Sequence, residues 1–209
     1  MVVTAIHSFT ASALTDTTEQ LSKAVNTIAE HPQFVIGTKV QDPTTIQITS
    51  EWPLIQAPSD LTDSTSFQAF NNTISSIASS PLTIIVASLD KSIFAAGTPP
   101  LIEFVHCSFP GSSSPEFRSK IDGDFARFES ILRRRGAPEE LGELGLATGW
   151  AEEKDGVRGF VVVRGWAEME KFEEAVQTEE FKEAIPILMG WDVPFELWHI
   201  EKKSGGEGL

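Results

Sequence analysis

The chain repeats one pattern of strands, helices and aromatic residues in its two halves, and this repetition constrains the fold more than any other feature. Each half opens on a short strand-like segment that carries a histidine and ends in a polar turn. Trp52 and Trp166 each close a later strand, and each is followed by a phenylalanine at the same spacing, Phe67 and Phe181. The repetition predicts two copies of one supersecondary unit, each near the commonest size of a domain.

The first half has the pattern of a strand, a helix, two strands, a helix and a strand. A capping box at Asp16 begins the first helix, and His31 ends it, because the residue before a proline disfavours the α region. Asp42 and Pro43 are predicted to form the turn between the two central strands. The strands are predicted at 2–9, 34–40, 45–52 and 82–89, and the helices at 16–31 and 67–78.

The second half repeats that order with clearer signals. Ser114 is a helix N-cap followed by proline at the first helical position, and Gly136 ends that helix. The strands are predicted at 101–107, 146–151, 159–166 and 195–200, and the second helix at 169–185. The chain is therefore divided into a first repeat at 1–94, a linker at 95–100, a second repeat at 101–201 and a disordered glycine-rich tail at 202–209.

Four strands with two helices on one face form the ferredoxin-like β-α-β-β-α-β arrangement. The helices cover one face of each sheet, and the other face needs a cover as well. The second sheet of the same chain is the obvious cover. We therefore predict an α+β fold in which two ferredoxin-like repeats pack sheet to sheet, giving a monomer with an internal pseudo-dimer and leaving further oligomerisation open.

The composition argues against several classes of partner. A formal net charge of −14 repels a nucleic-acid backbone or an anionic membrane from the surface as a whole. The basic run from Arg133 to Arg135 falls at a predicted helix C-terminus, where cations complement the helix dipole, and an anion site is the alternative. The single cysteine, Cys107, excludes an internal disulfide and fits a reducing cytosol. We expect a cytoplasmic protein without a secretory signal or a membrane-spanning segment.

The repeated order, the tryptophans that end strands and the phenylalanines that follow them resemble the dimeric α/β-barrel superfamily. More narrowly, residues 1–201 resemble the antibiotic-biosynthesis-monooxygenase-like domains, with two domains fused in one chain. That superfamily includes cofactor-free monooxygenases, polyketide cyclases, lyases, isomerases, haem-degrading enzymes and proteins without an established activity. The resemblance implies a single-chain dimeric α/β barrel with a pocket for a small ligand, and it leaves the reaction open.

The histidines are the best candidates for catalysis, because imidazole titrates near neutral pH and transfers protons. His106 and His199 lie among apolar residues on strands that the ferredoxin-like order makes neighbours. Arg164, on the strand that ends at Trp166, either stabilises an enolate or carboxylate or faces solvent. Val86 stands in the first repeat where His199 stands in the second, so the second repeat is the predicted host of a pocket. The predicted substrate contacts are Phe104, Trp166, Phe181 and Phe195.

Each candidate also has a structural interpretation, in which the histidines pack in the core and the tryptophans anchor the helices that follow. The chain contains no glycine-rich phosphate loop, CxxC pair, HExxH or GxSxG motif, so no cofactor and no metal is predicted. A mononuclear metal site in which His106 and His199 converge on a third ligand stays open. The lack of tyrosine argues against the phenol-assisted chemistry of some superfamily members, and the lack of a histidine in the second helix of either repeat argues against haem.

The leading hypothesis is a cofactor-independent enzyme of secondary metabolism that acts on a small apolar or aromatic carbonyl or polyketide-like molecule. Proton transfer by His106 or His199 would drive cyclisation, isomerisation or lyase chemistry. A monooxygenase that uses the substrate's own carbanion to activate oxygen is the nearest variant. The rival is a non-catalytic small-molecule-binding or scaffold protein, which a side-chain-filled interior in both repeats would favour.

Overall fold

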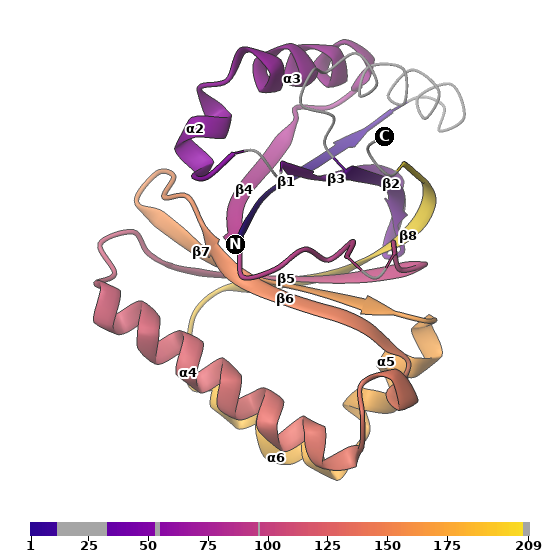
Figure 1. Cartoon of the computed structure of the whole chain (residues 1–209), viewed down its shortest axis with the longest axis vertical. Helices are drawn as coiled ribbons and strands as arrows, with labels where there is room; N and C mark the ends of the chain where they lie inside the picture. Colours follow the sequence, from indigo (N-terminus) through magenta and orange to yellow (C-terminus); the bar gives the residue numbers. More distant parts are fainter. Residues whose placement is uncertain (12–32, 53–54, 96, 207–209) are drawn as a thin grey trace.

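The computed structural model describes residues 1–11, 33–52, 55–95 and 97–206. Eight strands form one closed antiparallel barrel, with helices against its outer side (Figure 1). The helix predicted at 16–31 lies outside the described residues. The strands are β1 (Val2–Thr10), β2 (Gln33–Lys39), β3 (Asp42–Trp52), β4 (Thr83–Leu89), β5 (Leu101–Pro110), β6 (Glu143–Ala151), β7 (Val157–Trp166) and β8 (Phe195–Gly206).

The two halves of the chain use the same strand order. The barrel runs β1-β3-β2-β8-β5-β7-β6-β4, so the first half contributes the row β4-β1-β3-β2 and the second half the row β8-β5-β7-β6. The first strand of each half lies beside the last strand of that half, as the sequence pattern predicts. The rows join through β2–β8 and β4–β6, so closure gives every described strand two neighbours.

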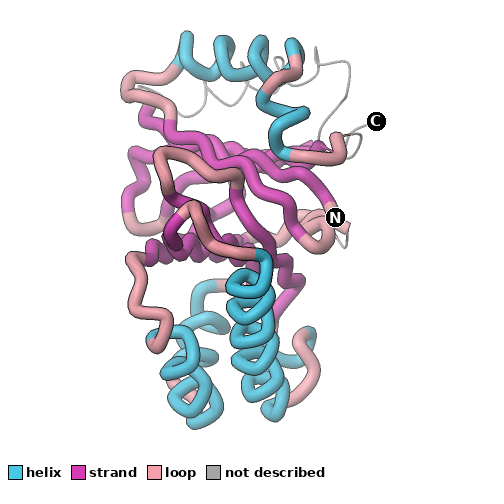
Figure 2. The backbone as a smooth tube through the Cα atoms, turned by 90° about the vertical axis from the view of Figure 1, so that its left-hand side faces the viewer, coloured by secondary structure: helices cyan, strands magenta, loops and turns pink. Residues whose placement is uncertain are grey.

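Helices cover two opposite sides of the barrel (Figures 1 and 2). The Ser114 side chain accepts a hydrogen bond from the Phe117 backbone N–H at 3.2 Å, so the predicted N-cap is confirmed. None of the described helices is both long and apolar enough to cross a membrane. Over the first half lie α2 (Pro58–Thr62) and α3 (Thr65–Ile77), and over the second half lie α4 (Pro115–Leu132), the short 3₁₀ helices η1 (Arg133–Arg135) and η2 (Glu139–Leu141), α5 (Met169–Val176) and α6 (Glu179–Met189).

The segment predicted as one helix at 169–185 forms two helices. α5 ends at Val176, and the Thr178 hydroxyl accepts a hydrogen bond from the Phe181 backbone N–H at 3.2 Å, which caps α6. The apolar spacing continues across the break, so periodicity alone merges the two elements. The separation leaves α5 as a short helix in which no residue is fully buried.

The glycine-rich segment predicted to be disordered at 202–209 instead continues β8 as far as Gly206. Its backbone pairs with β2, with Gly37 opposite Lys202 and Phe34 opposite Gly206. The pairing satisfies the backbone polar groups along the edge of β2 and closes the barrel on that side. A Cβ atom at Gly37 would lie 2.4 Å from the Glu201 carbonyl oxygen, so the close approach of the two strands requires glycine there.

The hairpin between β2 and β3 turns two residues earlier than predicted. Lys39 pairs with Asp42, which leaves Val40 and Gln41 as the turn. The Asp42 carboxylate accepts hydrogen bonds from the Thr44 hydroxyl at 2.7 Å and from the Thr44 backbone N–H at 3.2 Å. The aspartate thus stabilises the start of β3, and the shift places Gln41 at the tip of the hairpin.

Apolar side chains fill both the barrel and the two helix-covered faces. Inside the barrel the buried rings of Phe104 and Trp198 stack with their centroids 5.4 Å apart. α3 packs Phe67 and Phe70 against the outer face of the first half. Because alternate residues of a strand point to opposite faces, each strand of the second half sends one set of side chains into the barrel and the other toward α4 and α6.

Candidate functional site

A cavity of about 220 Å³ lies between the sheet of the second half and helices α4, α5 and α6. Its walls are mostly apolar, with Val105 and Val162 from the sheet and Phe125 and Leu188 from the helices. A mostly apolar cavity with a few polar groups is typical of a small-molecule site, and this one is smaller than most. Of the predicted substrate contacts, three line it: Trp166, Phe181 and Phe195.

Phe104 and His106 lie on the opposite face of the sheet from the cavity. Phe104 is stacked inside the barrel, so the structure does not support it as a substrate contact of this cavity. His106 is half-buried and pairs in register with Glu196 of β8. Burial lowers the pKa of His106, and the negative charge of Glu196 opposes the shift. His199 pairs in register with Glu103 on the cavity face, so the two predicted catalytic histidines point to opposite faces of the sheet.

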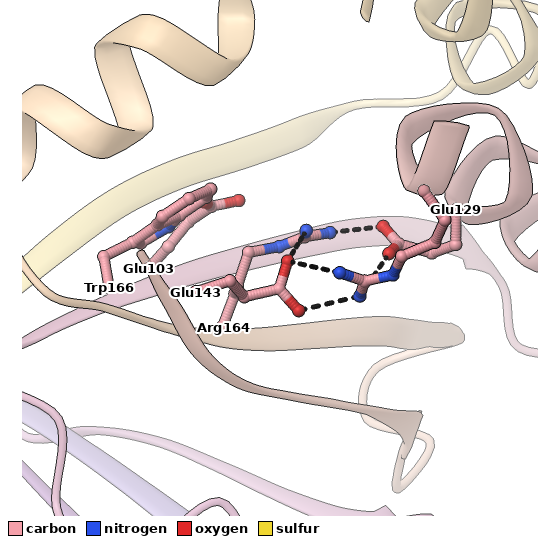
Figure 3. A network of polar contacts seen from close by, with 6 residues as sticks. Glu103, Glu129, Glu143, Arg164 and Trp166 are labelled. Atoms are coloured by element: carbon pink, nitrogen blue, oxygen red, sulfur yellow. Dashed lines mark hydrogen bonds and ion pairs between the residues drawn. The ribbon is translucent and has the colours of Figure 1, made fainter. Parts of the chain in front are cut away.

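Two arginines and two glutamates form a closed ring of ion pairs at the cavity wall (Figure 3). Arg164 of β7 donates to Glu143 of β6 at 2.7 Å and also to Glu129 of α4. Arg133 donates to Glu143 at 2.7 and 3.1 Å and to Glu129 at 3.1 Å. The ring joins α4, η1, β6 and β7, and its charges balance.

Arg164 is therefore held by carboxylates, and the alternative in which it faces solvent is wrong. The residue is only 5% exposed. Burial alone lowers the pKa of a guanidinium, but the charges of Glu129, Glu103 and Glu143 outweigh that effect and raise the pKa of Arg164. Two carboxylates occupy the ends of this guanidinium, which leaves it poorly placed to bind an anionic intermediate. Its direct effect is to fix the wall and to place a positive charge near Glu103.

Glu103 of β5 lines the cavity beside this ring. Its carboxylate accepts a hydrogen bond from the Trp166 indole N–H at 2.7 Å, and the residue is 8% exposed. Burial raises the pKa of the Glu103 carboxyl group, and the charge of Arg164 opposes part of the shift. Glu103 is not among the predicted site residues. The signal available in the sequence is a carboxylate in the middle of an apolar strand, on the same face as Val105 and Cys107.

The first half lacks this polar group at the corresponding positions. The register places Val3 opposite Trp52 in one half and Leu101 opposite Trp166 in the other. Counting from these pairs, Ala5 takes the place of Glu103 and Ser50 takes the place of Arg164. The same comparison places Val86 at the position of His199, as the sequence spacing indicates.

The two strand histidines do not correspond to one another. His7 pairs in register with Ile48, which puts it at the position of Val105 rather than of His106. His7 is fully buried on the helix-covered face of the first half, where its Nε2 atom lies 2.8 Å from the Asn71 side-chain oxygen. Phe67 and Phe70 pack against its ring. This arrangement agrees with the structural interpretation of His7 as a packed core residue.

The Gln41 side chain holds His199 in one tautomer. The His199 backbone N–H donates to Gln41 Oε1 at 3.1 Å, so the amide nitrogen of Gln41 faces the ring and donates to His199 Nδ1 at 3.0 Å. His199 Nδ1 is an acceptor, and the proton of the neutral ring is on Nε2. Burial lowers the pKa of His199 to about 4, which keeps the ring neutral at pH 7. Nε2 is buried without a hydrogen-bond partner among the described residues, and Nδ1 already accepts from Gln41, so no free lone pair of the ring is left for the predicted role as a base.

We expect the Nε2–H tautomer of His199 to depend on Gln41. In ¹⁵N NMR spectra at pH 7, His199 of the unaltered protein should show a protonated Nε2 and an unprotonated Nδ1. The Gln41→Ala variant should show a mixture of tautomers, because the amide donor to Nδ1 is removed. Gln177→Ala, at an exposed position, is the matched control and should leave the signals unchanged. A protonated Nδ1 in the unaltered protein would contradict the assignment.

The donors around the cavity do not fit a haem or a bound metal ion. Among the described residues that line it there is no histidine, and the chain has no tyrosine. Burial raises the pKa of the Cys107 thiol to about 11, so this cysteine is not a thiolate ligand. The described part of the chain holds no group of three or more histidine, cysteine, aspartate or glutamate residues arranged to bind a metal. The alternative in which His106 and His199 converge on a metal ion is wrong, because the two side chains point to opposite faces of the sheet.

No protein-family model matches the chain, and no curated protein matches its sequence. Solved structures match its fold over nearly the whole length. A "putative monooxygenase" from Lactobacillus acidophilus is 13% identical, with a TM-score of 0.63 over 99% of this chain and 96% of that chain. An anthrone oxidase-like protein is 12% identical, with a TM-score of 0.63 over 100% and 95% of the two chains. A haem-binding protein from Thermus thermophilus is 11% identical, with a TM-score of 0.56 over 97% and 92%.

At these identities the similarity shows the fold alone. The chain therefore has the α+β fold of these proteins, and in this chain the fold is a closed barrel of eight antiparallel strands with helices on two sides. Within that fold, the cavity and its buried carboxyl group belong to the second half of the chain.

Proposed function

We propose that the chain is a small-molecule enzyme of the antibiotic-biosynthesis-monooxygenase-like kind, built as a single-chain dimeric α/β barrel from two ferredoxin-like repeats. The identical strand order of the two halves supports this division, with the boundary in the connection 95–100 and the second repeat extended to the end of β8. The descriptions of its structural neighbours as a monooxygenase and an anthrone oxidase-like protein support the class. The buried thiol of Cys107 fits a reducing compartment such as the cytoplasm.

The proposed reaction is proton transfer on a small apolar or aromatic carbonyl or polyketide-like molecule. The observation that carries the proposal is the Glu103 carboxyl group, which lines an apolar cavity with a raised pKa and a fixed hydrogen bond to Trp166. As a carboxylate, Glu103 removes a proton from the carbon next to the substrate carbonyl. As a carboxylic acid, it returns the proton to the substrate at the same or another atom.

The carbanion formed in this step is common to several outcomes. It attacks a second carbonyl in a cyclisation, is reprotonated elsewhere in an isomerisation, or reacts with molecular oxygen in a cofactor-independent oxygenation. Glu103 takes the role predicted for His106 and His199. Arg164 acts through the ion-pair ring, which fixes the wall around Glu103. The apolar lining excludes water and holds a molecule without strong polar groups over most of its surface.

We expect Glu103→Gln to slow proton abstraction by about 100-fold or more, because general base catalysis contributes at least that much. The measurement is hydrogen–deuterium exchange at the carbon next to the carbonyl, followed by ¹H NMR in D₂O with aryl 1,3-diketones and aryl keto acids as probes. The rate in the unaltered protein should rise with pH through the raised pKa of Glu103, since the carboxylate is the base.

Glu196→Gln is the matched control, because Glu196 is an exposed carboxylate on β8 that faces His106 on the other side of the sheet. It should leave the exchange rate unchanged. His106→Gln should also leave the rate unchanged. Equal exchange by the Glu103→Gln variant and the unaltered protein would remove Glu103 from the reaction.

A non-catalytic small-molecule-binding protein is the second candidate. The full pairing of Arg164 with Glu129 and Glu143 favours it, because no cation of the ring is left to stabilise an anionic intermediate. In that case the same probes would raise the melting temperature of the protein without any exchange above the rate in buffer.

A further inference from the structure

Three consecutive arginines after α4 have three different environments. Arg133 belongs to the ion-pair ring, and Arg134 pairs with Glu183 of α6. Arg135 lines the cavity and is half-buried. Within the described part of the chain, no carboxylate lies within ion-pair distance of Arg135. The helix dipole alone therefore does not explain the run. Two of its three guanidinium groups have carboxylate partners among the described residues, and the third, that of Arg135, has none.

The other charged groups of the cavity wall are accounted for by neighbours or by solvent. Arg133, Arg164 and Glu143 neutralise one another in the ring together with Glu129. Glu103 is bound by the Trp166 indole, and Asp192 is exposed to solvent after the end of α6. Arg135 remains as a cation of the cavity without a carboxylate partner in the described ranges. The chain has 30 acidic residues against 16 lysines and arginines, so an unpaired arginine at a cavity is not explained by a shortage of carboxylates.

We propose that Arg135 binds a carboxylate group of the ligand. The planar fork of a guanidinium donates two parallel hydrogen bonds to a carboxylate, which gives both energy and orientation. The inference rests on the proposed function and narrows its substrate class to small oxo acids with an aromatic or branched apolar part. The carboxylate lies at Arg135, the apolar part lies among Phe128, Phe181 and Leu188, and the reacting carbon is presented to Glu103.

Matched acids and esters test the inference. The first pair is phenylpyruvate and its methyl ester. The second pair is 3-phenylpropionate and its methyl ester, and both compounds of this pair lack the reacting ketone. Dissociation constants are measured by calorimetry on the full chain at two salt concentrations. We expect each acid to bind about 10- to 100-fold more tightly than its ester, as for hydrogen bonds to a charged group. The preference should weaken as salt is raised.

Arg135→Gln should abolish the preference for the acid in both pairs, and Arg135→Lys should keep part of it because the charge remains without the fork. Arg134→Gln is the matched control, since Arg134 is an exposed neighbour that pairs with Glu183, and it should keep the full preference.

The outcomes separate this inference from the proposed function. Equal binding of acid and ester in both pairs, or an acid preference that survives Arg135→Gln, overturns the role of Arg135 even if Glu103-dependent exchange is observed. An Arg135-dependent preference for 3-phenylpropionate supports the anion site even if no probe undergoes exchange. Absence of binding by all four compounds overturns the inference as well.

Discussion

Replacing Arg164 with methionine is expected to lower the free energy of unfolding by about 3 to 5 kcal/mol, the effect of removing one partner of a buried ion pair. Arg164 is 5% exposed and donates to Glu129 and Glu143, which are 9% and 5% exposed. Without it both carboxylates stay buried, and Arg133 alone faces them from a position closer to solvent. Urea unfolding at pH 7, followed by circular dichroism, gives the measurement.

Arg134→Met is the control for this prediction. Arg134 and Glu183 form an ion pair in which both side chains are about half exposed, so its removal should change the free energy of unfolding by less than about 1 kcal/mol. The triple variant Arg164→Met, Glu129→Gln, Glu143→Gln should recover much of the loss, because no carboxylate is then left buried without a partner. Equal effects of Arg164→Met and Arg134→Met would contradict the description of the ring as a buried unit.

The strand order and most element positions follow from local patterns. The alternation of apolar residues in β1 and β5, the Ser114 cap and the two tryptophans that end β3 and β7 each act within a few residues, so they are readable in the sequence. The neighbours of each strand then follow from the ferredoxin-like order, because few arrangements of this pattern are sterically sensible.

The closure of the barrel depends on contacts that no local pattern contains. The glycine-rich segment from Lys202 onward resembles a disordered tail in composition, yet its backbone pairs with β2 as far as Gly206, and β2 lies far away in the sequence. Backbone pairing places few demands on side chains, so composition is a poor guide to it. The register of the strands likewise separates His7 from His106, although both follow similar local sequences.

The candidate site was less predictable than the fold, for a related reason. Trp166, Phe181 and Phe195 line the cavity, and their positions on strand and helix faces are predictable from periodicity. The state of Arg164 depends on Glu129 from α4 and Glu143 from β6, which only the tertiary structure brings together. The pKa of Glu103 depends on burial in the same environment. Residue type alone favours histidine as the proton carrier, whereas the proposed function assigns this role to the Glu103 carboxyl group.

Acidification should destabilise the protein through two histidines, His7 and His199. Burial lowers the pKa of each to about 4, with the Asn71 hydrogen bond opposing the shift at His7, whereas a histidine in the unfolded chain titrates near 6.5. The folded state therefore binds fewer protons than the unfolded state between these values. The free energy of unfolding is therefore highest above pH 6.5, where both histidines are neutral in either state, and it falls as the pH falls toward 4. Between pH 7 and pH 5 we expect each histidine to lower the free energy of unfolding by about 2 kcal/mol.

Urea unfolding at half-unit steps between pH 5 and pH 6.5 measures this dependence. Each of His7→Gln and His199→Gln should reduce the slope by about one proton, or about 1.4 kcal/mol per pH unit, and the double variant should reduce it by about two. Glu51 and Glu103 have raised pKa values and act in the opposite direction, but they are present in all variants, so differences between slopes isolate the histidines. Unchanged slopes in the single variants would mean that the buried rings titrate as they do in the unfolded chain, and the neutral state assigned to His199 would then be wrong.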